Sequence, residues 1–515
     1  MTEVELKLSL DPFHAPKLRR HGLLKGVKPV TRHLHSVYLD TPAWDLMKRR
    51  IAFRVRKAGS RWVQTLKAES DSVGALTRRP EWEVDLPRGH HDLSLLPAEA
   101  LALLKGVNVD LIGPAFATDF RRTAWQVMHG GAEMELALDV GEIQSGPHTL
   151  PLCEVEIELK SGPREALFDL AQSLLEQVPM GVEPRSKAAR GYTLAGAVGP
   201  KPVKAVSPRL DKGMDAGQAW AQLAESALVQ LVGNVPGFLS TPQEIEYLHQ
   251  LRIGLRRLRT MAGLADSVGR ANPPWDEGLR AVMADLNGAR DWDVLLAEVL
   301  PRLEVALEDA PLGAAMKRRL AGEALAARGK AQAAIASPAF TCLVLEIGQD
   351  LLDVPPDGGA LQPWAAARLE ECWQRVLKRG KGFDRLDAAR RHRLRITAKR
   401  LRYTADVLGP AFAGDDKFVA QLARLQNRLG VMQDNVVASR LLASLKSRSK
   451  DLLFDAGRLV GVLAGEREGQ GQGGGKAWQA LARSRPFWRG KPKAKHQAKP
   501  QAKLQVKLQV KSRKR

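Results

Sequence analysis

The first 200 residues contain six segments in which polar and apolar side chains alternate. Alternation with a period of two is typical of β-strands, because successive side chains of a strand point to opposite faces. The six segments are Glu3–Leu8, Ala52–Arg56, Val63–Lys67, Glu81–Leu86, Glu133–Asp139 and Glu154–Lys160. Their polar positions are charged, with both signs. One such strand could face solvent, but so many of them predict a closed sheet whose interior is charged.

The charged residues of these segments share strand faces. Glu3, Glu5 and Lys7 lie on one face of the first segment. The same spacing recurs at Arg54 and Arg56, at Arg79, Glu81 and Glu83, and at Glu154, Glu156 and Glu158, while single charges stand at Lys67, Arg122, Asp139 and Lys187. Enclosing these charges in one volume is costly unless a ligand or an ion compensates them.

This mixture of charges suits a phosphate chain that is bound together with a metal ion. Carboxylate oxygens are ligands for Mg²⁺ or Mn²⁺, which also keep waters and phosphate oxygens. Arg binds phosphate oxygens in pairs, and Lys binds them as a point charge. Metals and cations stabilise the spread negative charge of phosphoryl transfer while a positioned water attacks in line. The lumen therefore predicts chemistry on a metal-bound phosphate chain.

Residues 209–465 are rich in Ala, Leu, Arg, Gln and Glu with a period near 3.6, which predicts an all-helical region. Within it, HQLRIGLRRLR (His249–Arg259) matches HRLRITAKRLR (His392–Arg402) at seven of eleven positions. A second motif, Leu286–Val294, corresponds to Leu429–Val437. Both pairs are offset by 143 residues, so we expect a duplicated helical bundle.

Each copy of the first motif carries a basic stripe. Spacings of three, four and three residues place a His and three cations on one helical face. The two basic stripes are His249, Arg252, Arg256 and Arg259, and His392, Arg395, Lys399 and Arg402. Like charges at this spacing repel, so either Asp291 and Asp434 within the bundle or a bound anion must neutralise them. Metal coordination by the two His residues is a rival that the surrounding cations disfavour.

The net charge of +22 points to a polyanionic partner. Residues 1–200 are close to neutral, with 26 Lys and Arg against 25 Asp and Glu, whereas residues 489–515 contain 11 Lys and Arg and no acid. We expect this tail to be disordered. It serves either as a solubilising segment or in non-specific, salt-dependent contact with polyphosphate or nucleic acid.

The length of 515 residues requires at least two domains. Shifts of composition place them at residues 1–197 and 213–465, with a linker over 198–212 and a Gly/Gln-rich linker and Lys-rich tail over 466–515. Three widely spaced cysteines favour a reducing cytoplasm, and the lack of an apolar run of about 18 residues argues against a membrane partner.

The charged strands resemble those of the CYTH, or triphosphate tunnel metalloenzyme, superfamily. EVELK at the N-terminus is similar to the ExExK signature of that superfamily, and further motifs follow in family order. They are VYLDTP, FRVR, TLK, RPEWE, TDFRRTAW, LALDVG, EVEIELK and SKAARGY. The resemblance implies an eight-stranded antiparallel tunnel that cleaves triphosphate-containing substrates with Mg²⁺ or Mn²⁺.

The same resemblance implies roles for the inward residues. The metal ligands would be Glu3, Glu5, Asp139, Glu154 and Glu156. The phosphate-binding cations would be Lys7, Arg54, Arg56, Lys67, Arg122 and Lys187. Glu3, Glu5 and Lys7 would form the catalytic set, and Arg122 is preferred over its neighbour Arg121 because of its spacing to Trp125.

The duplicated helices resemble the CHAD family, a helical domain found fused behind CYTH domains. The phrases LHQLRIGLRRLR, LNGARDWDVL, RLRITAKRLRY and LQNRLGVMQD carry this likeness. It implies a pseudo-two-fold helical bundle that binds inorganic polyphosphate through the residues of the two basic stripes.

We therefore expect an α+β multidomain protein with an N-terminal antiparallel β tunnel, an all-α duplicated bundle and a basic tail. The expected activity is metal-dependent hydrolysis of tripolyphosphate in the cytoplasm or at polyphosphate granules. One alternative keeps the tunnel but changes its substrate to thiamine or nucleoside triphosphates, or its reaction to that of an adenylate cyclase. The other is a polyphosphate-granule or nucleic-acid binding protein with a vestigial tunnel.

Overall fold

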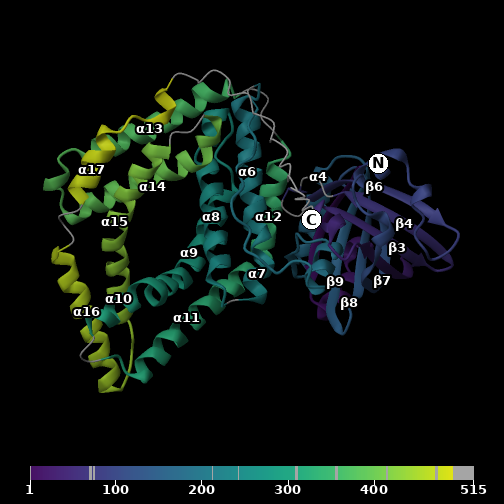
Figure 1. The fold of residues 1–515 in the computed structure, drawn as a ribbon, viewed down its shortest axis with the longest axis horizontal. Coiled ribbons are helices and arrows are strands. Elements are labelled where there is room, and N and C mark those ends of the chain that lie inside the picture. Colours follow the sequence, from purple (N-terminus) through teal and green to yellow (C-terminus); the bar gives the residue numbers. More distant parts are fainter. Residues whose placement is uncertain are drawn as a thin grey trace, which may run out of the picture.

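The computed structural model describes residues 2–68, 72–73, 76–211, 213–241, 243–307, 311–353, 358–412, 416–469 and 474–490. These residues form a β-rich tunnel domain near the N-terminus and a helical half, which lie side by side (Figure 1). The Lys-rich segment after Gly490, for which we expect disorder, lies outside the described residues.

Eight antiparallel strands close into a ring in the tunnel domain. The order around the ring is β1-β9-β8-β7-β2-β3-β4-β6, and pairing of β1 with β6 closes it. The short strands β5 (Ser72–Val73) and β10 (Met180–Val182) extend the same sheet beside β6 and β1. The ring strands are β1 (Thr2–Leu10), β2 (Val30–Asp40), β3 (Ile51–Ala58), β4 (Arg61–Ala68), β6 (Leu76–Leu86), β7 (Gly113–His129), β8 (Ala132–Ser145) and β9 (His148–Ser161). The expected eight-stranded antiparallel tunnel is confirmed.

All six segments with charge alternation lie in ring strands. The remaining two strands, β2 and β7, are not marked by charge alternation, because their inward positions include uncharged residues. Ser36 and Tyr38 of β2 pair across to Arg56 and Arg54 of β3, and Phe120 of β7 lies beneath the Lys187 ammonium. A strand can therefore complete a charged lumen without being charged along its own length.

The outer face of the tunnel is apolar and covered. Leu6 and Leu8 of β1 alternate with its inward charges and are fully buried, as are Val155 and Ile157 of β9. They pack in one cluster with Phe168 of α4 (Glu165–Leu175). The other helices of the tunnel domain are α1 (Ala15–Arg19), α2 (Asp45–Lys48), α3 (Ala98–Leu103) and α5 (Lys187–Leu194).

The helical half also contributes to this cover through α12 (Pro338–Asp350), which lies against α4 and β10 (Figure 1). Leu345 of α12 belongs to the same apolar cluster as Phe168. The Thr341 hydroxyl donates to the backbone carbonyl of Met180 at 2.9 Å, and the Gln172 amide donates to Gln349 at 2.9 Å. The two halves therefore share part of one core.

The helical half repeats one arrangement of helices. α6 packs against α8 as α13 packs against α14, and the two copies of the second motif lie in α9 and α15. The helices are α6 (Ala216–Gly233), α7 (Val235–Ser240), α8 (Ile245–Ala262), α9 (Trp275–Val294), α10 (Leu300–Ala306), α11 (Ala314–Ile335), α13 (Leu361–Gly380), α14 (Ala388–Leu408), α15 (Asp416–Ala443), α16 (Lys450–Gly469) and α17 (Gly474–Arg483). No single described helix is long and apolar enough to cross a membrane, although α11 and α12, bent by 51°, would together meet that requirement.

Residues beyond the expected end of the bundle at Gly465 also belong to the helical half. α16 continues to Gly469, and α17 with the turn that follows it packs on the core of the bundle. The indole nitrogen of buried Trp488 donates to the Glu370 carboxylate at 2.9 Å. Arg489 binds the same carboxylate, and its hydrogen bonds hold the pKa of Glu370 at about 2.

Replacing Trp488 by Ala should lower the free energy of unfolding of the helical half by about 3 kcal/mol, because a large buried aromatic side chain leaves a cavity. Chemical denaturation followed by circular dichroism measures this change. Phe454→Ala is the control, since Phe454 is 68% exposed and its loss should change stability by less than about 0.5 kcal/mol. Equal effects of both substitutions would show that residues 484–490 do not stabilise the bundle.

Candidate functional site

The ring of strands encloses a cavity of about 670 Å³. Its wall is dominated by charged side chains of both signs, in contrast to the apolar outer face of the same strands. The lining residues are Glu5, Lys7, Tyr38, Ala52, Arg54, Arg56, Lys67, Glu81, Glu83, Arg122, Glu156, Glu158, Leu159, Lys160, Ser186, Lys187 and Ala188.

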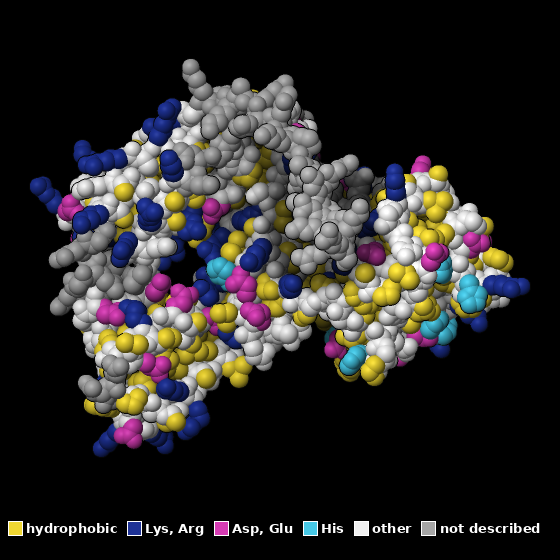
Figure 2. Space-filling view, viewed as in Figure 1, with side chains coloured by type: hydrophobic (Ala, Val, Ile, Leu, Met, Phe, Trp, Pro, Cys, Tyr) yellow, Lys and Arg dark blue, Asp and Glu magenta, His cyan; other side chains and the backbone are white. Residues whose placement is uncertain are grey.

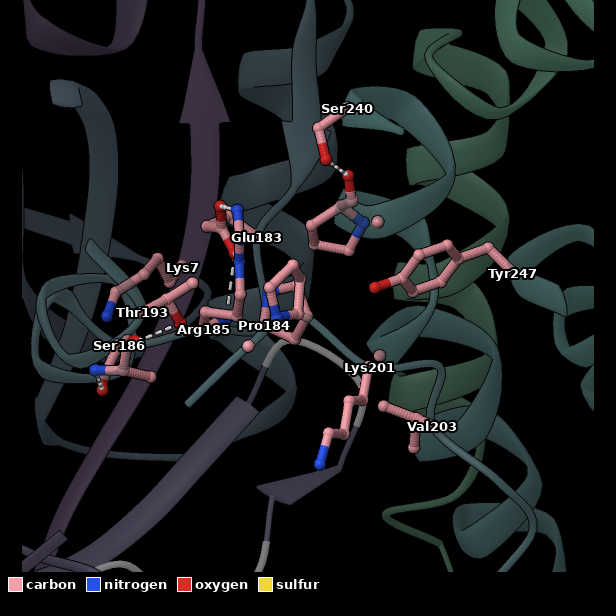
Figure 3. Close-up of a pocket in the computed structure, with 16 residues that line it drawn as sticks. Lys7, Glu183, Pro184, Arg185, Ser186, Thr193, Lys201, Val203, Ser240 and Tyr247 are labelled. Atoms are coloured by element: carbon pink, nitrogen blue, oxygen red, sulfur yellow. Dashed lines mark hydrogen bonds and ion pairs between the residues drawn. The ribbon is translucent and has the colours of Figure 1, made fainter. Parts of the chain in front are cut away.

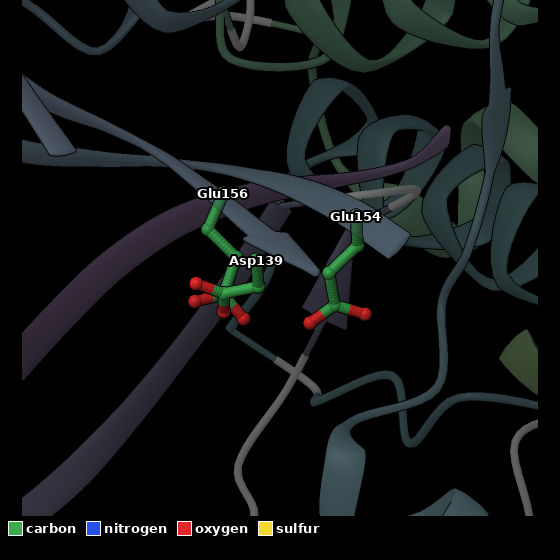
Figure 4. Close-up of side chains that lie close together, drawn as sticks. All are labelled: Asp139, Glu154 and Glu156. Atoms are coloured by element: carbon green, nitrogen blue, oxygen red, sulfur yellow. The ribbon is translucent and has the colours of Figure 1, made fainter. Parts of the chain in front are cut away.

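Three buried carboxylates gather on one wall of this lumen (Figure 4). Asp139 on β8 lies directly across from Glu154 on β9, and Glu156 follows two positions later on the same face. Each offers a carboxylate oxygen within 4.8 Å of the others. Oxygen donors at this spacing match the ligands that hard divalent cations prefer. This acidic cluster could hold a metal ion.

Several cations neutralise the acidic cluster, and Lys187 and Arg122 each bind more than one of its carboxylates. The Lys187 ammonium lies 2.7 Å from Asp139 Oδ2 and 2.9 Å from Glu156 Oε1, and it also binds Glu154. Arg122 donates to both oxygens of Asp139 at 2.8 and 2.7 Å and also to Glu156. Burial alone would raise the pKa of Glu156, but Lys187, Lys7 and Arg122 hold it well below its usual range. The Glu156 carboxylate therefore stays ionised at neutral pH.

The wall formed by β3 and β4 carries the cations Arg54, Arg56 and Lys67. Arg56 donates to the Ser36 hydroxyl at 3.1 Å, and its closest charged neighbours include Arg54 and Arg122. Burial first, and then the positive charge of these two neighbours, lower the pKa of Arg56 to about 9. Lys67 lies 2.8 Å from Glu81. Buried positive charges in mutual repulsion are stabilised when an anion enters between them.

The structure brings most of the expected tunnel residues into this one lumen. Those that line it are Glu5, Lys7, Arg54, Arg56, Lys67, Arg122, Glu156 and Lys187. Asp139 and Glu154 lie behind the lining and are fully buried. Arg122 faces inward and Arg121 is exposed, as the spacing predicts. The side chain of Glu3 lies outside the described residues, so its expected role stays a prediction.

Arg190 and Tyr38 are among the residues of the site that were not predicted from the sequence. Arg190 is buried and binds Glu154 from α5, and Tyr38 lines the lumen, where Arg54 donates to its hydroxyl at 3.5 Å. Arg190 follows Lys187 by one helical turn, which is a signal that the sequence contains. Tyr38 shares its strand face with Ser36, but nothing in that strand indicates that the face is part of a charged lumen.

The two basic stripes of the helical half converge. The Arg256 guanidinium on α8 donates to the Tyr403 hydroxyl on α14 at 2.7 Å and lies over its ring. Burial first, and then Arg395 and Arg256, lower the pKa of Lys399 to about 8, while burial and Arg256 lower the pKa of Arg252 to about 10. Cations from both helices therefore share one partly buried region, and Figure 2 shows Lys and Arg side chains beside an opening in the helical half.

The ends of the stripes have acidic or polar partners of their own. Arg259 lies 3.5 Å from Asp276, and Arg402 donates to Gln426 at 3.1 Å. The His392 ring is 3.1 Å from the Gln433 amide oxygen. Asp291 lies 3.7 Å from Arg440. The centre of the converged region therefore consists of Arg252, Arg256, Arg395 and Lys399.

Comparisons with known proteins agree with this division of the chain. Residues 1–192 match the CYTH domain family, and residues 222–443 match the CHAD domain family. The inorganic triphosphatase of Haemophilus influenzae is 32% identical over 200 residues, which are 38% of this chain and 55% of that protein. The matched part is therefore about half the length of that relative.

Among solved structures, the CHAD domain from the plant Ricinus communis is 28% identical, with a TM-score of 0.50. The match covers 56% of this chain and 98% of that domain. The closed ring thus lies within the CYTH match, and the duplicated helices lie within the CHAD match. The chain is a CYTH domain fused to a CHAD domain and is distantly related to inorganic triphosphatase.

Proposed function

We propose that the tunnel domain is a metal-dependent inorganic triphosphatase, which hydrolyses tripolyphosphate with water to diphosphate and phosphate. The observation that carries this proposal is the pairing of two opposed walls in one lumen. One wall gathers carboxylates. The other buries Arg56, whose pKa is lowered by burial and then by the positive charges of Arg54 and Arg122, and places Arg54 3.9 Å from Glu81. A phosphate chain with a divalent cation satisfies both walls at once. The relationship to an inorganic triphosphatase supports the inorganic substrate.

The donor set fits Mg²⁺ or Mn²⁺, because it consists of carboxylate oxygens on one side of an enclosed polar cavity. We assign the metal to Glu5 and Glu156 at the lumen surface, with Asp139 and Glu154 behind them and Glu3 as a further ligand. When bound, the metal neutralises phosphate charge and favours ionisation of water.

The remaining residues bind and position the phosphates. Arg54, Arg56 and Lys67 donate to phosphate oxygens from β3 and β4, and Lys7 and Arg122 do so from the acidic wall. Lys187 and Arg122 also hold Glu156 ionised, and they hold the carboxylates of the acidic cluster in place. Because these groups are fixed by the ring before substrate enters, little reorganisation accompanies the reaction.

The helical half has a separate proposed function, the binding of inorganic polyphosphate. Burial lowers the pKa of Arg395. Burial first, and then the like charges around them, lower the pKa values of Arg252 and Lys399. The partly buried region therefore contains charge repulsion between Arg252, Arg256 and Lys399. A polyanion relieves it, whereas a metal cation would add to it. The outer members of the stripes, His249, Arg259, His392 and Arg402, extend this surface along the two helices.

The first test measures phosphate release from tripolyphosphate with Mg²⁺ or Mn²⁺. Joint replacement of Glu5 and Glu156 by Gln should lower kcat/KM by at least about 100-fold, because both metal-binding charges are lost. Glu133→Gln is the control, since Glu133 is exposed on β8. An inactive wild-type protein, or a fully active double variant, would refute the proposal. Thiamine triphosphate and ATP in the same assay test the organic alternatives, including cyclisation.

The second test concerns the charge balance of the acidic cluster. Lys187→Met removes the ammonium shared by three carboxylates and should cost on the order of 3–5 kcal/mol in stability. Mn²⁺ should restore more stability to this variant than to the wild type, because it replaces the lost charge. Thermal denaturation with and without Mn²⁺ measures both effects. Lys160→Met is the control, because the Lys160 side chain is 38% exposed and its ion pair with Glu158 is worth under about 1 kcal/mol.

The third test is the pH dependence of polyphosphate binding at constant ionic strength. Lys399 has a pKa of about 8 and is charged at pH 7, and a bound anion would raise that pKa. Affinity should therefore fall as the pH rises from 7 to 9, by at most about ten-fold for the loss of this one proton. Calorimetric titration of Lys399→Arg should show a flatter profile, and Lys378→Arg, at an exposed position on α13, should keep the wild-type profile. Identical profiles for all three proteins would remove Lys399 from the binding region.

A further inference from the structure

A second cavity, of about 360 Å³, lies between the tunnel domain and the helical half (Figure 3). The loop before α5 forms one side of it with Glu183, Pro184, Arg185 and Ser186. The segment that joins the two halves contributes Lys201, and the helical half contributes Ser240 and Tyr247. Its volume is in the range of cavities that hold small ligands.

This interdomain cavity adjoins the tunnel lumen. Lys7 and Ser186 line both spaces, and the Lys7 ammonium lies 3.2 Å from Glu156 of the acidic cluster. A ligand that fills the lumen and extends past these two residues therefore enters the space between the halves.

The polar groups around the interdomain cavity favour an anion. Its one described carboxylate, that of Glu183, accepts two hydrogen bonds from the Arg185 side chain at 2.9 and 2.7 Å. Lys7 shares its positive charge with Glu156 and Glu5 of the lumen, at 3.2 and 3.9 Å, so Lys201 supplies the further positive charge of this lining. The Tyr247 hydroxyl points into the cavity (Figure 3), and burial and then Glu244 raise the pKa of Tyr247, so that its hydroxyl keeps its proton as a donor.

The remaining lining does not offer a place for a stacked organic ring. Tyr247 presents its hydroxyl rather than its ring face to the cavity (Figure 3). Its ring packs so closely on Gly237 that a Cβ atom added at this glycine would lie 2.1 Å from the ring. Pro184, Pro200 and Pro236 give the wall little conformational freedom. Donors and cations on a stiff wall suit phosphate oxygens.

We propose that the interdomain cavity is a further phosphate subsite, which holds the end of a linear polyphosphate longer than the three phosphates in the lumen. This inference rests on the proposed triphosphatase function and extends its substrate class to short linear polyphosphates of four or more phosphates. The helical half then takes part in substrate binding by the tunnel through Tyr247, in addition to its own basic stripes.

The test compares kcat/KM for linear pentapolyphosphate with that for tripolyphosphate in the full chain. Lys201→Ala and Tyr247→Phe should each lower the ratio by about three- to ten-fold, as expected for one lost hydrogen bond to a charged ligand. Both variants should fold, because Lys201 is exposed and Phe keeps the buried ring of Tyr247. Lys204→Ala is the matched control, since Lys204 is exposed in the same segment and does not line the cavity, so its ratio should equal that of the wild type.

The possible failures are distinguishable. Tripolyphosphate turnover with an unchanged ratio in both variants would overturn the subsite and leave the triphosphatase proposal standing. A protein without any tripolyphosphate turnover would refute that proposal, and the subsite with it. A loss confined to ATP or thiamine triphosphate would assign the cavity to an organic group and overturn the polyphosphate inference.

Discussion

The closed sheet of the tunnel domain has its charged side chains inside and its apolar side chains outside, and the rest of the structure depends on this inversion. Along β1 and β9, the inward positions hold Glu5, Lys7 and Glu156, and the alternate positions hold buried leucine, valine and isoleucine. Such a ring is stable only when something covers its outer face and something neutralises its interior. α4 and α12 provide the cover, and internal ion pairs provide the neutralisation.

The charged side chains on the two walls of the lumen are not neutralised to the same extent, and this difference bears on function. On the acidic wall, Lys187 and Arg122 each bind more than one carboxylate. On the opposite wall, Lys67 and Arg54 lie 2.8 and 3.9 Å from Glu81. Burial first, and then the positive charges of Arg54 and Arg122, lower the pKa of Arg56 on that wall. The imbalance favours a negatively charged ligand.

Much of the architecture follows from the sequence, because both of its periodicities are strong. Charge alternation marks six of the eight ring strands, and the 143-residue offset marks the duplicated helices. The rest depends on contacts between distant segments. Lys187 resembles a phosphate-binding residue by motif, yet α5 brings its ammonium among three carboxylates. The basic stripes are regular in sequence, yet Arg259 of α8 forms an ion pair with Asp276 of α9. The spacing of residues within α8 does not predict this contact.

The two copies of the duplicated motif have also diverged. Arg257 on α8 is buried and donates to Gln230 at 2.9 Å, whereas Arg400, its counterpart at the 143-residue offset, is exposed on α14. The first copy lies nearer the tunnel domain, where α7 and α8 border the interdomain cavity. Equivalent positions in a duplicated chain thus meet different surroundings, and their side chains serve different purposes.

The cover that α12 places over α4 has a consequence for how such chains combine. The family matches end at residue 192 and begin again at residue 222, which suggests two interchangeable modules. The apolar cluster extends across that boundary, because it contains Leu345 of the helical half together with Phe168 and the outer faces of β1 and β9. A tunnel domain joined to an unrelated partner would inherit an uncovered apolar strip. Exchange of one module therefore requires a compensating surface on the other, which ties the evolution of the two halves together.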